Sequence, residues 1–250
     1  MLDKYKHGMH ILKNWNEIGN AINGLKAESL NTHNEPAKCW DFWNIRELLL
    51  RNKVSQDACI VDMGCGASVY GAITLELLRT MGYKNLTGID LYVPLYARVW
   101  AVIRGWFKFR ELFPYRIIES DITSTKFPND SVDVAILLSV VEHGVNLEKL
   151  FCELARVLKV GAVVYLSTDY WAEKIETDRK LVSSGARDNE PLPWFIFDKS
   201  SLRNLIKLAK KYGFHESDDD EIPPCQDKPV YWQGVNYTFV ALEFKKFELS

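Results

Sequence analysis

Residues 60–71 carry the clearest chemical signal in this chain of 250 residues. The segment reads IVDMGCGASVYG: an apolar run that contains the acid Asp62, followed by Gly64 and Gly66 in a short turn. A glycine turn after a buried strand lets the backbone approach a small polar or anionic ligand closely. The segment therefore predicts a cofactor-binding loop.

Two common cofactor loops do not fit these residues. A phosphate-binding P-loop would place Lys and then Ser or Thr after its last glycine, but Ala72 and Ile73 follow Gly71. A dinucleotide loop of the form G-x-G-x-x-G would need a third glycine where this chain has Val69. A third kind of loop, an acid-bearing D-x-G-x-G turn, does fit.

The loop must be positioned by the elements around it, and their pattern alternates. Apolar runs predict strands at 58–64, 85–90, 115–121, 131–139 and 162–169, and an alternating run predicts a last strand at 235–246. Helical spacing predicts helices at 38–51, 69–81, 94–109, 147–159 and 199–214, the last opened by a Ser cap. This alternation indicates an α/β fold with a mostly parallel sheet and helices on both faces.

The polar residues that follow these predicted strands share one edge of the sheet. Asp90 ends the second strand, Asp121 ends the third, and residues 139–143 follow the fourth. Ligands of open parallel sheets bind outside the carboxyl ends of the strands. We therefore expect these groups to converge with the glycine loop on one crevice.

Several ordered motifs together resemble the class I S-adenosylmethionine-dependent methyltransferases. They are the D-x-G-x-G turn, GIDLY around Asp90, ESDI around Asp121, and the E-H pair followed by a helix ending in R-V-L-K. The resemblance is close over residues 58–169. It implies a Rossmann-like, seven-stranded, mostly parallel sheet with an antiparallel last strand, methyltransferase activity, and S-adenosylmethionine as cofactor. Ser68 departs from it, because many relatives carry a third glycine there.

The resemblance also implies roles for individual residues. Asp90 would accept hydrogen bonds from the two ribose hydroxyls, and Asp121 from the adenine amino group. Asp62 would organise the loop or reach the cofactor's amino group. The glycines and the remaining positions would surround the cofactor: Gly64, Gly66, Leu91, Ile122, Leu138 and Ser139.

His143 is the candidate catalytic residue. A sulfonium methyl group is already activated, so positioning supplies much of the acceleration, and an oxygen nucleophile gains from a base such as His. The alternative is that His143 only shapes the pocket or contacts the cofactor. We expect no metal site: His7 and His10 have no Cys or carboxylate beside them, and DDDE at 218–221 is typical of a solvated loop.

The sequence indicates the methyl acceptor less clearly than the cofactor. Segments 168–178, 192–197 and 229–239 resemble methyltransferases encoded among surface-polysaccharide genes, which implies O-methylation of a sugar or glycan precursor. The candidate acceptor-site residues are Glu142, Tyr170, Trp171, Trp194 and Trp232. The aromatic ones could stack on sugar faces or could equally be packing residues. Other small metabolites or RNA stay open as acceptors, as do a non-catalytic cofactor-binding domain and an NAD-dependent enzyme.

Composition limits the partners and the cellular location that we expect for the protein. A net charge of -2 argues against broad nucleic-acid binding, and no apolar run is long enough for a membrane helix. Five widely spaced cysteines and no signal-peptide pattern favour a cytoplasmic protein. We expect an N-terminal helical appendage at 1–57 and a methyltransferase domain at 58–250, with a substrate-cap insertion at about 170–197.

Residues 98–116 interleave basic and aromatic side chains: Arg98, Arg104, Lys108, Arg110 and Arg116 among Trp100, Trp106, Phe107 and Phe109. The ordinary interpretation is a helix whose aromatic side packs on the sheet and whose basic side faces water. The composition is also typical of helices that lie on membranes, so peripheral membrane contact is a second interpretation.

Overall fold

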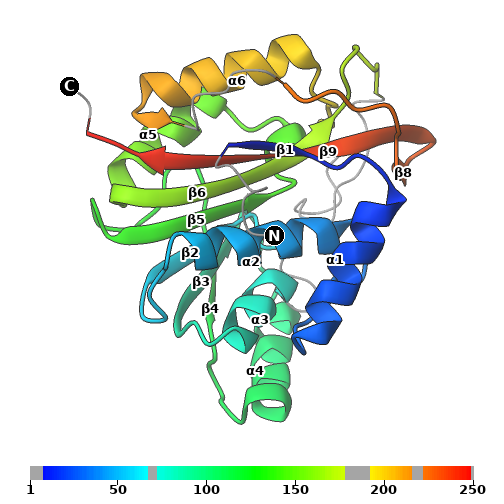
Figure 1. Ribbon diagram of the computed structural model, residues 1–250. Coiled ribbons are helices and arrows are strands. Elements are labelled where there is room, and N and C mark those ends of the chain that lie inside the picture. The colour runs from blue at the N-terminus through cyan, green and yellow to red at the C-terminus, as the bar shows by residue number, and fades with distance from the viewer. Residues whose placement is uncertain (1–7, 67–71, 178–191, 216–221, 249–250) are drawn as a thin grey trace.

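The computed structural model describes residues 8–66, 72–177, 192–215 and 222–248. One twisted sheet runs through the molecule (Figure 1), and its strands follow the order β1-β9-β6-β5-β2-β3-β4, with β7 and β8 also paired to β9. The strands are β1 (Met9–Ile11), β2 (Cys59–Met63), β3 (Asn85–Asp90), β4 (Arg116–Glu119), β5 (Val132–Leu138), β6 (Leu158–Tyr170), β7 (Phe214–His215), β8 (Val230–Trp232) and β9 (Val235–Lys246).

This sheet confirms the predicted fold class. Strands β4, β3, β2, β5 and β6 are mutually parallel, and the last strand, β9, runs antiparallel to β6. The predicted number of strands is too small, because β1, β7 and β8 are two or three residues long and join the sheet only through β9. Segments this short carry no periodicity of their own.

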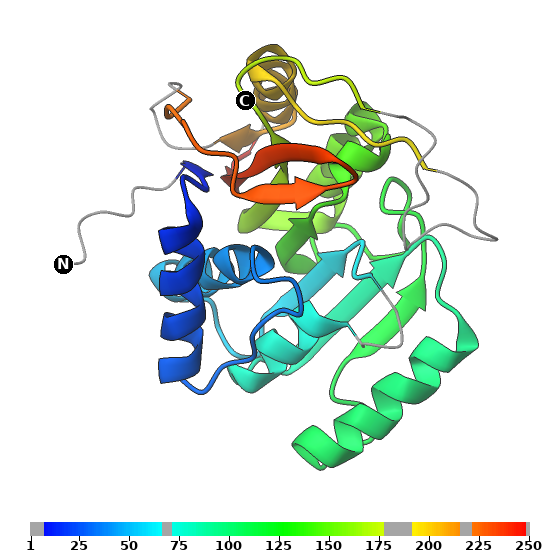
Figure 2. The ribbon, with the colours of Figure 1, turned by 90° about the vertical axis from the view of Figure 1, so that its right-hand side faces the viewer.

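Helices cover both faces of the sheet (Figures 1 and 2). Alternate residues of each strand point to opposite faces, so Ile60 packs with Leu48 and Leu75, while Val61 packs with Leu150. The helices are α1 (Trp15–Ala27), α2 (Lys38–Arg51), α3 (Ile73–Thr80), α4 (Leu95–Phe109), α5 (Leu147–Val157) and α6 (Lys199–Lys211), with a 3₁₀ turn η1 (Val141–His143).

The observed helix ends agree in part with those predicted from the sequence. The bounds of α2 agree with the prediction, and α4 begins one residue after Pro94, which is its N-cap. The Ser cap predicted for α6 is wrong: Asp198 is the N-cap, and Ser201 completes a capping box by accepting the Asp198 backbone N–H. Predicted residues 69–71 of α3, together with Ser68, lie outside the described residues.

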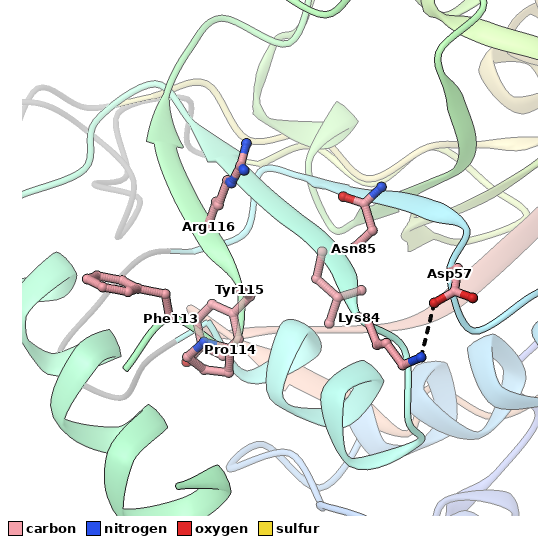
Figure 3. Close-up of a pocket in the computed structure, with 8 residues that line it drawn as sticks. Asp57, Lys84, Asn85, Phe113, Pro114, Tyr115 and Arg116 are labelled. Atoms are coloured by element: carbon pink, nitrogen blue, oxygen red, sulfur yellow. Dashed lines mark hydrogen bonds and ion pairs between the residues drawn. The ribbon is translucent and has the colours of Figure 1, made fainter. Parts of the chain in front are cut away.

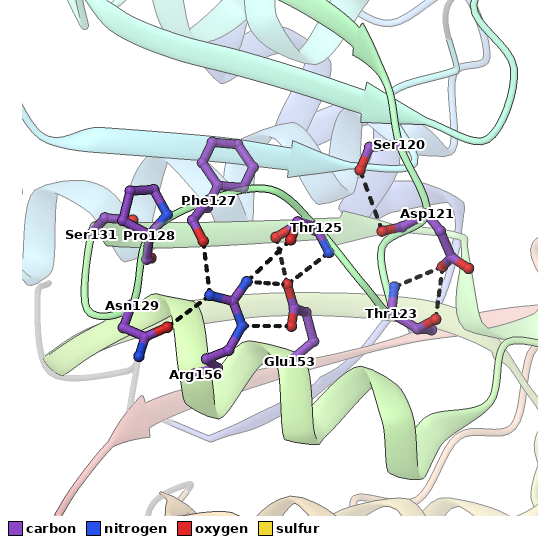
Figure 4. Close-up of polar contacts among 10 residues, drawn as sticks. All are labelled: Ser120, Asp121, Thr123, Thr125, Phe127, Pro128, Asn129, Ser131, Glu153 and Arg156. Atoms are coloured by element: carbon purple, nitrogen blue, oxygen red, sulfur yellow. Dashed lines mark hydrogen bonds and ion pairs between the residues drawn. The ribbon is translucent and has the colours of Figure 1, made fainter.

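The arginine of the R-V-L-K motif, Arg156, forms a local hydrogen-bond network (Figure 4). Arg156 donates to Glu153 on its own helix, to the carbonyls of Thr125 and Phe127, and to Asn129 Oδ1 at 2.8 Å. These contacts tie the C-terminal end of α5 to the loop before β5. They hold that strand, whose carboxyl end carries Ser139 and η1, against its covering helix.

Helix α4 corrects the ordinary interpretation of residues 98–116. Its packed face consists of Ala97, Ala101 and Gly105, while Trp106 and Phe107 are exposed. The small residues let the helix lie close to the body, so the aromatic side chains point outward.

The predicted cap insertion at 170–197 is described only in part, since 178–191 lie outside the described residues. The DDDE segment at 218–221 and His7 lie outside them as well. At the edges of the insertion, Phe197 forms a β-bridge with Tyr170. Across the part of the chain that the structure describes, no helix has the length and apolar character needed to cross a membrane.

Candidate functional site

A cavity of about 1200 Å³ opens at the carboxyl ends of β2, β3, β4 and β5. The predicted crevice therefore exists. Nine of the predicted site residues line it: Gly64, Gly66, Asp90, Leu91, Asp121, Ile122, Leu138, Ser139 and His143.

Gly64 and Gly66 of the glycine loop have backbone conformations that favour glycine. Gly64 has φ +83°, and a Cβ there would lie 2.5 Å from Val140 Cγ2, so no larger residue fits without a shift. Gly66 has φ +61° and faces open space. Its N–H donates to Asp90 Oδ2 at 2.9 Å, and the Leu91 N–H donates to Oδ1 at 2.8 Å. The loop and the carboxylate of Asp90 are thus positioned together.

Asp62 lies beneath this loop and does not line the cavity. Its carboxyl group is buried, and neither oxygen accepts a hydrogen bond of normal geometry within the described structure. Burial and then repulsion from Asp90 raise the pKa of Asp62 to about 7, although the Thr74 hydroxyl opposes the rise. A buried acid without a donor marks a position where a bound donor or cation gives a large benefit.

Asp121 follows β4 and closes a turn. Its Oδ1 accepts from both the N–H and the hydroxyl of Thr123 at 2.8 Å (Figure 4). This is the turn-forming role that an acid after a strand commonly has. Because Asp121 is exposed and lines the cavity beside the buried Ile122, it can also accept a bond from a ligand.

Lys38 enters the cavity from the start of α2. Its Nζ donates to the hydroxyl of Ser139, lies 3.6 Å from Asp41 Oδ2, and sits 3.6 Å above the ring of Phe239. Ser139 has φ +53°, a strained value for a residue with a side chain, at the end of β5. The strained serine and the buried lysine hold each other at the cavity wall.

Two buried acids lie behind Lys38. Thr168 donates to Glu142 Oε2 at 2.9 Å, and the Trp194 indole donates to Asp169 Oδ2 at 2.8 Å. Burial raises the pKa of both carboxyl groups, repulsion from Glu142 raises that of Asp169 further, and Lys38 opposes both rises. Lys38 is therefore the counter-charge of this cluster.

The ring of His143 is fixed by a backbone carbonyl. Its Nδ1 lies 3.3 Å from the Pro193 oxygen, which can only accept, so Nδ1 carries the hydrogen. In the neutral ring, Nε2 is then the basic atom. Burial lowers the pKa of His143, against the opposing effects of Pro193 and Asp169, so the neutral ring prevails at pH 7.

With this geometry in place, comparisons with known proteins identify the domain. Residues 61–166 match the profile of a family described as a methyltransferase domain. Residues 61–166 therefore form a methyltransferase domain. This confirms the enzyme class and the cofactor expected from the D-x-G-x-G turn, Asp90 and Asp121.

Individual relatives of the methyltransferase domain are distant. The sterol 24-C-methyltransferase of Yarrowia lipolytica is 23% identical over 71% of this chain and 47% of its own length, so the chain spans about half of that relative. A SAM-dependent methyltransferase from Methanosarcina mazei superposes with a TM-score of 0.52 at 20% identity, covering 80% of this chain and 97% of its own.

A third similar protein was solved with the cofactor. Phosphoethanolamine N-methyltransferase 2 of Haemonchus contortus, in complex with S-adenosyl-L-methionine, has a TM-score of 0.54 at 16% identity, covering 82% of this chain and 53% of its own. At such identities the structural likeness establishes the fold. The acceptors named for these relatives differ, so the acceptor of this methyltransferase domain must be argued from its own residues.

The residues of the domain fit the cofactor. Asp90 and Asp121 present carboxylate groups at the cavity, and the open space at Gly66 leaves room beside the loop. When bound, S-adenosylmethionine supplies a methyl group activated on a sulfonium. Of the described residues, no three His, Cys, Asp or Glu side chains are grouped so as to hold a metal ion.

The predicted acceptor-site aromatics are not at the cavity. Tyr170 and Trp194 are 1% exposed, because protein atoms cover their rings, which favours the packing alternative for these two residues. Trp232 packs edge-on against Trp194, with ring centroids 4.7 Å apart, and Trp171 lies under Lys228. None of the four lines the cavity, and Glu142 contributes from behind it.

A polar wall that no sequence pattern indicated lines the cavity instead. His33, Asn34, Glu35 and Lys38 line the cavity from the segment before α2 and from its first residue. Asn146 and Lys149 complete a polar rim at the start of α5. A lysine at the start of an amphipathic helix looks like an ordinary solvated residue in the sequence, so no local signal marks it.

A second, smaller hollow lies at the opposite, amino ends of β3 and β4 (Figure 3). Its polar members include Lys84 and Asp57, an exposed ion pair at 3.1 Å. Exposed pairs of this kind contribute little to stability or binding. The cavity at the carboxyl ends is therefore the candidate active site.

Proposed function

We propose that this chain transfers the methyl group of S-adenosylmethionine to a hydroxyl oxygen of a polar acceptor, a sugar or glycan precursor. The proposal is based on the tautomer and the lowered pKa of His143. Its Nδ1 is held by the Pro193 carbonyl and its pKa is lowered, so Nε2 is a neutral base at the cavity. A hydroxyl acceptor loses a proton as its oxygen is methylated, and a neutral histidine can take that proton.

In this proposal, the chain's own groups have separate tasks. Asp90 accepts from the ribose hydroxyls, and Asp121 and Ile122 hold the adenine. Gly64, Gly66, Leu138 and Ser139 surround the methionine part, while Asp62 organises the loop from beneath it. His143 Nε2 removes the acceptor proton as the new C–O bond forms and the C–S bond breaks. The products are a methyl ether, a neutral thioether and a protonated His143.

The polar wall supports a hydroxyl-rich or anionic acceptor. His33, Asn34 and Glu35 offer donors and acceptors, and Lys38 and Lys149 offer positive charge. A nucleotide-sugar or a lipid-linked sugar has both hydroxyls and phosphates, which matches this wall. The resemblance of segments 168–178 and 229–239 to enzymes of surface-polysaccharide gene clusters supports the same acceptor class.

The test is radiolabelled methyl transfer into separate fractions of nucleotide-sugars, lipid-linked glycans, small metabolites and RNA. We expect label in a sugar fraction, as an alkali-stable ether. Label only in RNA or in a sugar-free metabolite would contradict the acceptor class. Calorimetric titration with S-adenosylmethionine and with NAD runs in parallel: binding without any turnover would indicate a non-catalytic cofactor-binding domain.

A further inference from the structure

Helix α4 has its apolar side turned away from the protein. Its inner face is made of Ala97, Ala101 and Gly105. A Cβ at Gly105 would lie 2.6 Å from the ring of Pro114, so glycine at this position lets the chain after the helix turn back onto its inner face. An ordinary surface helix buries its large apolar residues and exposes its small and polar ones.

Ion pairs hold the inner side of α4 against α3. Arg104 donates to Glu76 of α3 at 2.6 and 2.9 Å, and Lys108 donates to the same carboxylate at 2.8 Å. Glu76 itself is buried, and these cations lower its pKa despite the opposing effect of burial. The helix is thus held firmly by charges on the inside, and its outward face is a fixed surface.

The outward face is a continuous apolar stripe. At 3.6 residues per turn its helical members fall within an arc of about 140°. Their exposed fractions range from 38% to 76%, and two further apolar residues follow the helix at 54% and 77%: Leu95, Tyr96, Val99, Trp100, Ile103, Trp106, Phe107, then Leu112 and Phe113. Figure 3 shows the ring of Phe113 pointing away from Pro114 and Tyr115. Contiguous exposed apolar patches of this kind mark interaction surfaces.

The charges around the stripe have one sign. Residues 95–116 hold five basic residues and one acid, Glu111, which Arg79 pairs. Arg98, Arg110 and Arg116 are exposed and form no ion pair within the described part of the chain. A second copy docked on this face across a two-fold axis would bring these cations together. An anionic surface with an apolar interior complements both the stripe and the charges.

We propose that α4 and Leu112–Phe113 form an interfacial element that docks this protein on an anionic lipid bilayer. The helix, about 22 Å long, lies in the plane of the interface. Its aliphatic and phenyl side chains enter the acyl boundary, and Tyr96, Trp100 and Trp106 place their polar atoms among the headgroups. The exposed arginines contact lipid phosphates.

This docking would also orient the cavity. Leu91 lines the cavity, is 54% exposed, and lies three residues before Pro94, the N-cap of α4. The cofactor end of the cavity is therefore adjacent to the start of the docked helix. The inference rests on the surface of α4 and is independent of which acceptor is methylated.

The test is co-sedimentation of the full chain with phosphatidylcholine vesicles that contain or lack phosphatidylglycerol. We expect the wild type to bind the anionic vesicles. The double variant Phe107→Glu/Phe113→Glu should bind at least ~10-fold more weakly, because it replaces two rings at the acyl boundary with charged side chains. Arg98→Gln/Arg110→Gln should lower the preference for phosphatidylglycerol.

The matched control is Trp15→Glu/Tyr231→Glu, which changes two exposed aromatics on α1 and β8. It should bind vesicles like the wild type, and all three double variants should bind S-adenosylmethionine normally, which separates this test from that of the proposed function. Three results would overturn the proposal: no vesicle binding by the wild type, equal loss in the control, or a wild-type dimer that Phe107→Glu/Phe113→Glu dissociates. Binding of single-stranded RNA in place of vesicles would overturn it as well.

Discussion

The backbone N–H of Gly66 donates to Oδ2 of Asp90 at 2.9 Å, which ties the loop after β2 to the end of β3. The Leu91 N–H donates to the other oxygen at 2.8 Å. These two backbone bonds orient the carboxylate of Asp90 at the cavity. This explains how an acid 24 residues after Gly66 belongs to the same ligand site.

Asp90→Ala should weaken S-adenosylmethionine binding by about ten- to a hundred-fold. Hydrogen bonds to a charged group are worth about 1.5–3 kcal/mol, and the variant also frees the Gly66 N–H from its partner. Calorimetric titration measures the change. Asp57→Ala, an exposed acid at the other end of the sheet, is the control and should bind normally. Wild-type affinity in Asp90→Ala would remove the ribose role.

Asp62→Asn should make the unliganded protein less sensitive to pH between 5 and 8. The pKa of Asp62 is raised to about 7, so its contribution to stability is fully present below the unfolded pKa of about 3.9 and is lost as pH rises through about 7. Thermal midpoints of both proteins across this range give the comparison. Parallel curves would show that Asp62 is not protonated in the folded state.

His143→Ala should reduce methyl transfer by about 10²–10⁴-fold while cofactor affinity stays constant. Because burial lowers the pKa of His143, the wild-type rate should rise with pH through a midpoint below the ordinary histidine value and level off near neutrality. Rate profiles of wild type and variant from pH 5 to 9 test this. Full activity in His143→Ala would remove the general-base role and leave a pocket-shaping residue.

Lys38→Met should destabilise the fold by about 3–5 kcal/mol, because it leaves buried acids without their counter-charge. Asp41 loses its cation 3.6 Å away, and the pKa values of Glu142 and Asp169 should rise further. Urea unfolding measures the loss. The matched control is Lys84→Met, which breaks the exposed pair with Asp57 and should cost less than about 1 kcal/mol. Equal effects would mean that Lys38 is not the counter-charge.

Arg156→Met should lower the free energy of unfolding by about 1.5–3 kcal/mol, since it removes charge-assisted bonds to Glu153 and to two loop carbonyls. Lys211→Met is the control, because its ion pair with Glu148 is exposed on both sides. If both variants unfold at the same denaturant concentration as the wild type, the network of Figure 4 does not stabilise the loop before β5.

Local patterns were sufficient for the elements that carry the cofactor. Buried parallel strands are short apolar runs, and the polar residue after each run lies at the carboxyl edge by topology alone. Asp90, Asp121 and the glycine turn could therefore be grouped from the order of residues along the chain. Helix caps were harder to predict. The N-cap of α6 is Asp198 and not a serine, because either residue type can accept the first free N–H of a helix.

The acceptor side could not be predicted in this way, because it depends on contacts between distant segments. Lys38 reaches Ser139 across 101 positions of sequence, and only the packing of α2 on the sheet brings them together. The tertiary packing also covers Tyr170 and Trp194. Which side of α4 faces inward was likewise decided by the close approach that Ala97, Ala101 and Gly105 allow. The sequence by itself determined the fold class, the cofactor and one edge of the site; the tertiary structure decided which side chains the cavity and the surface present, since burial depends on the whole chain.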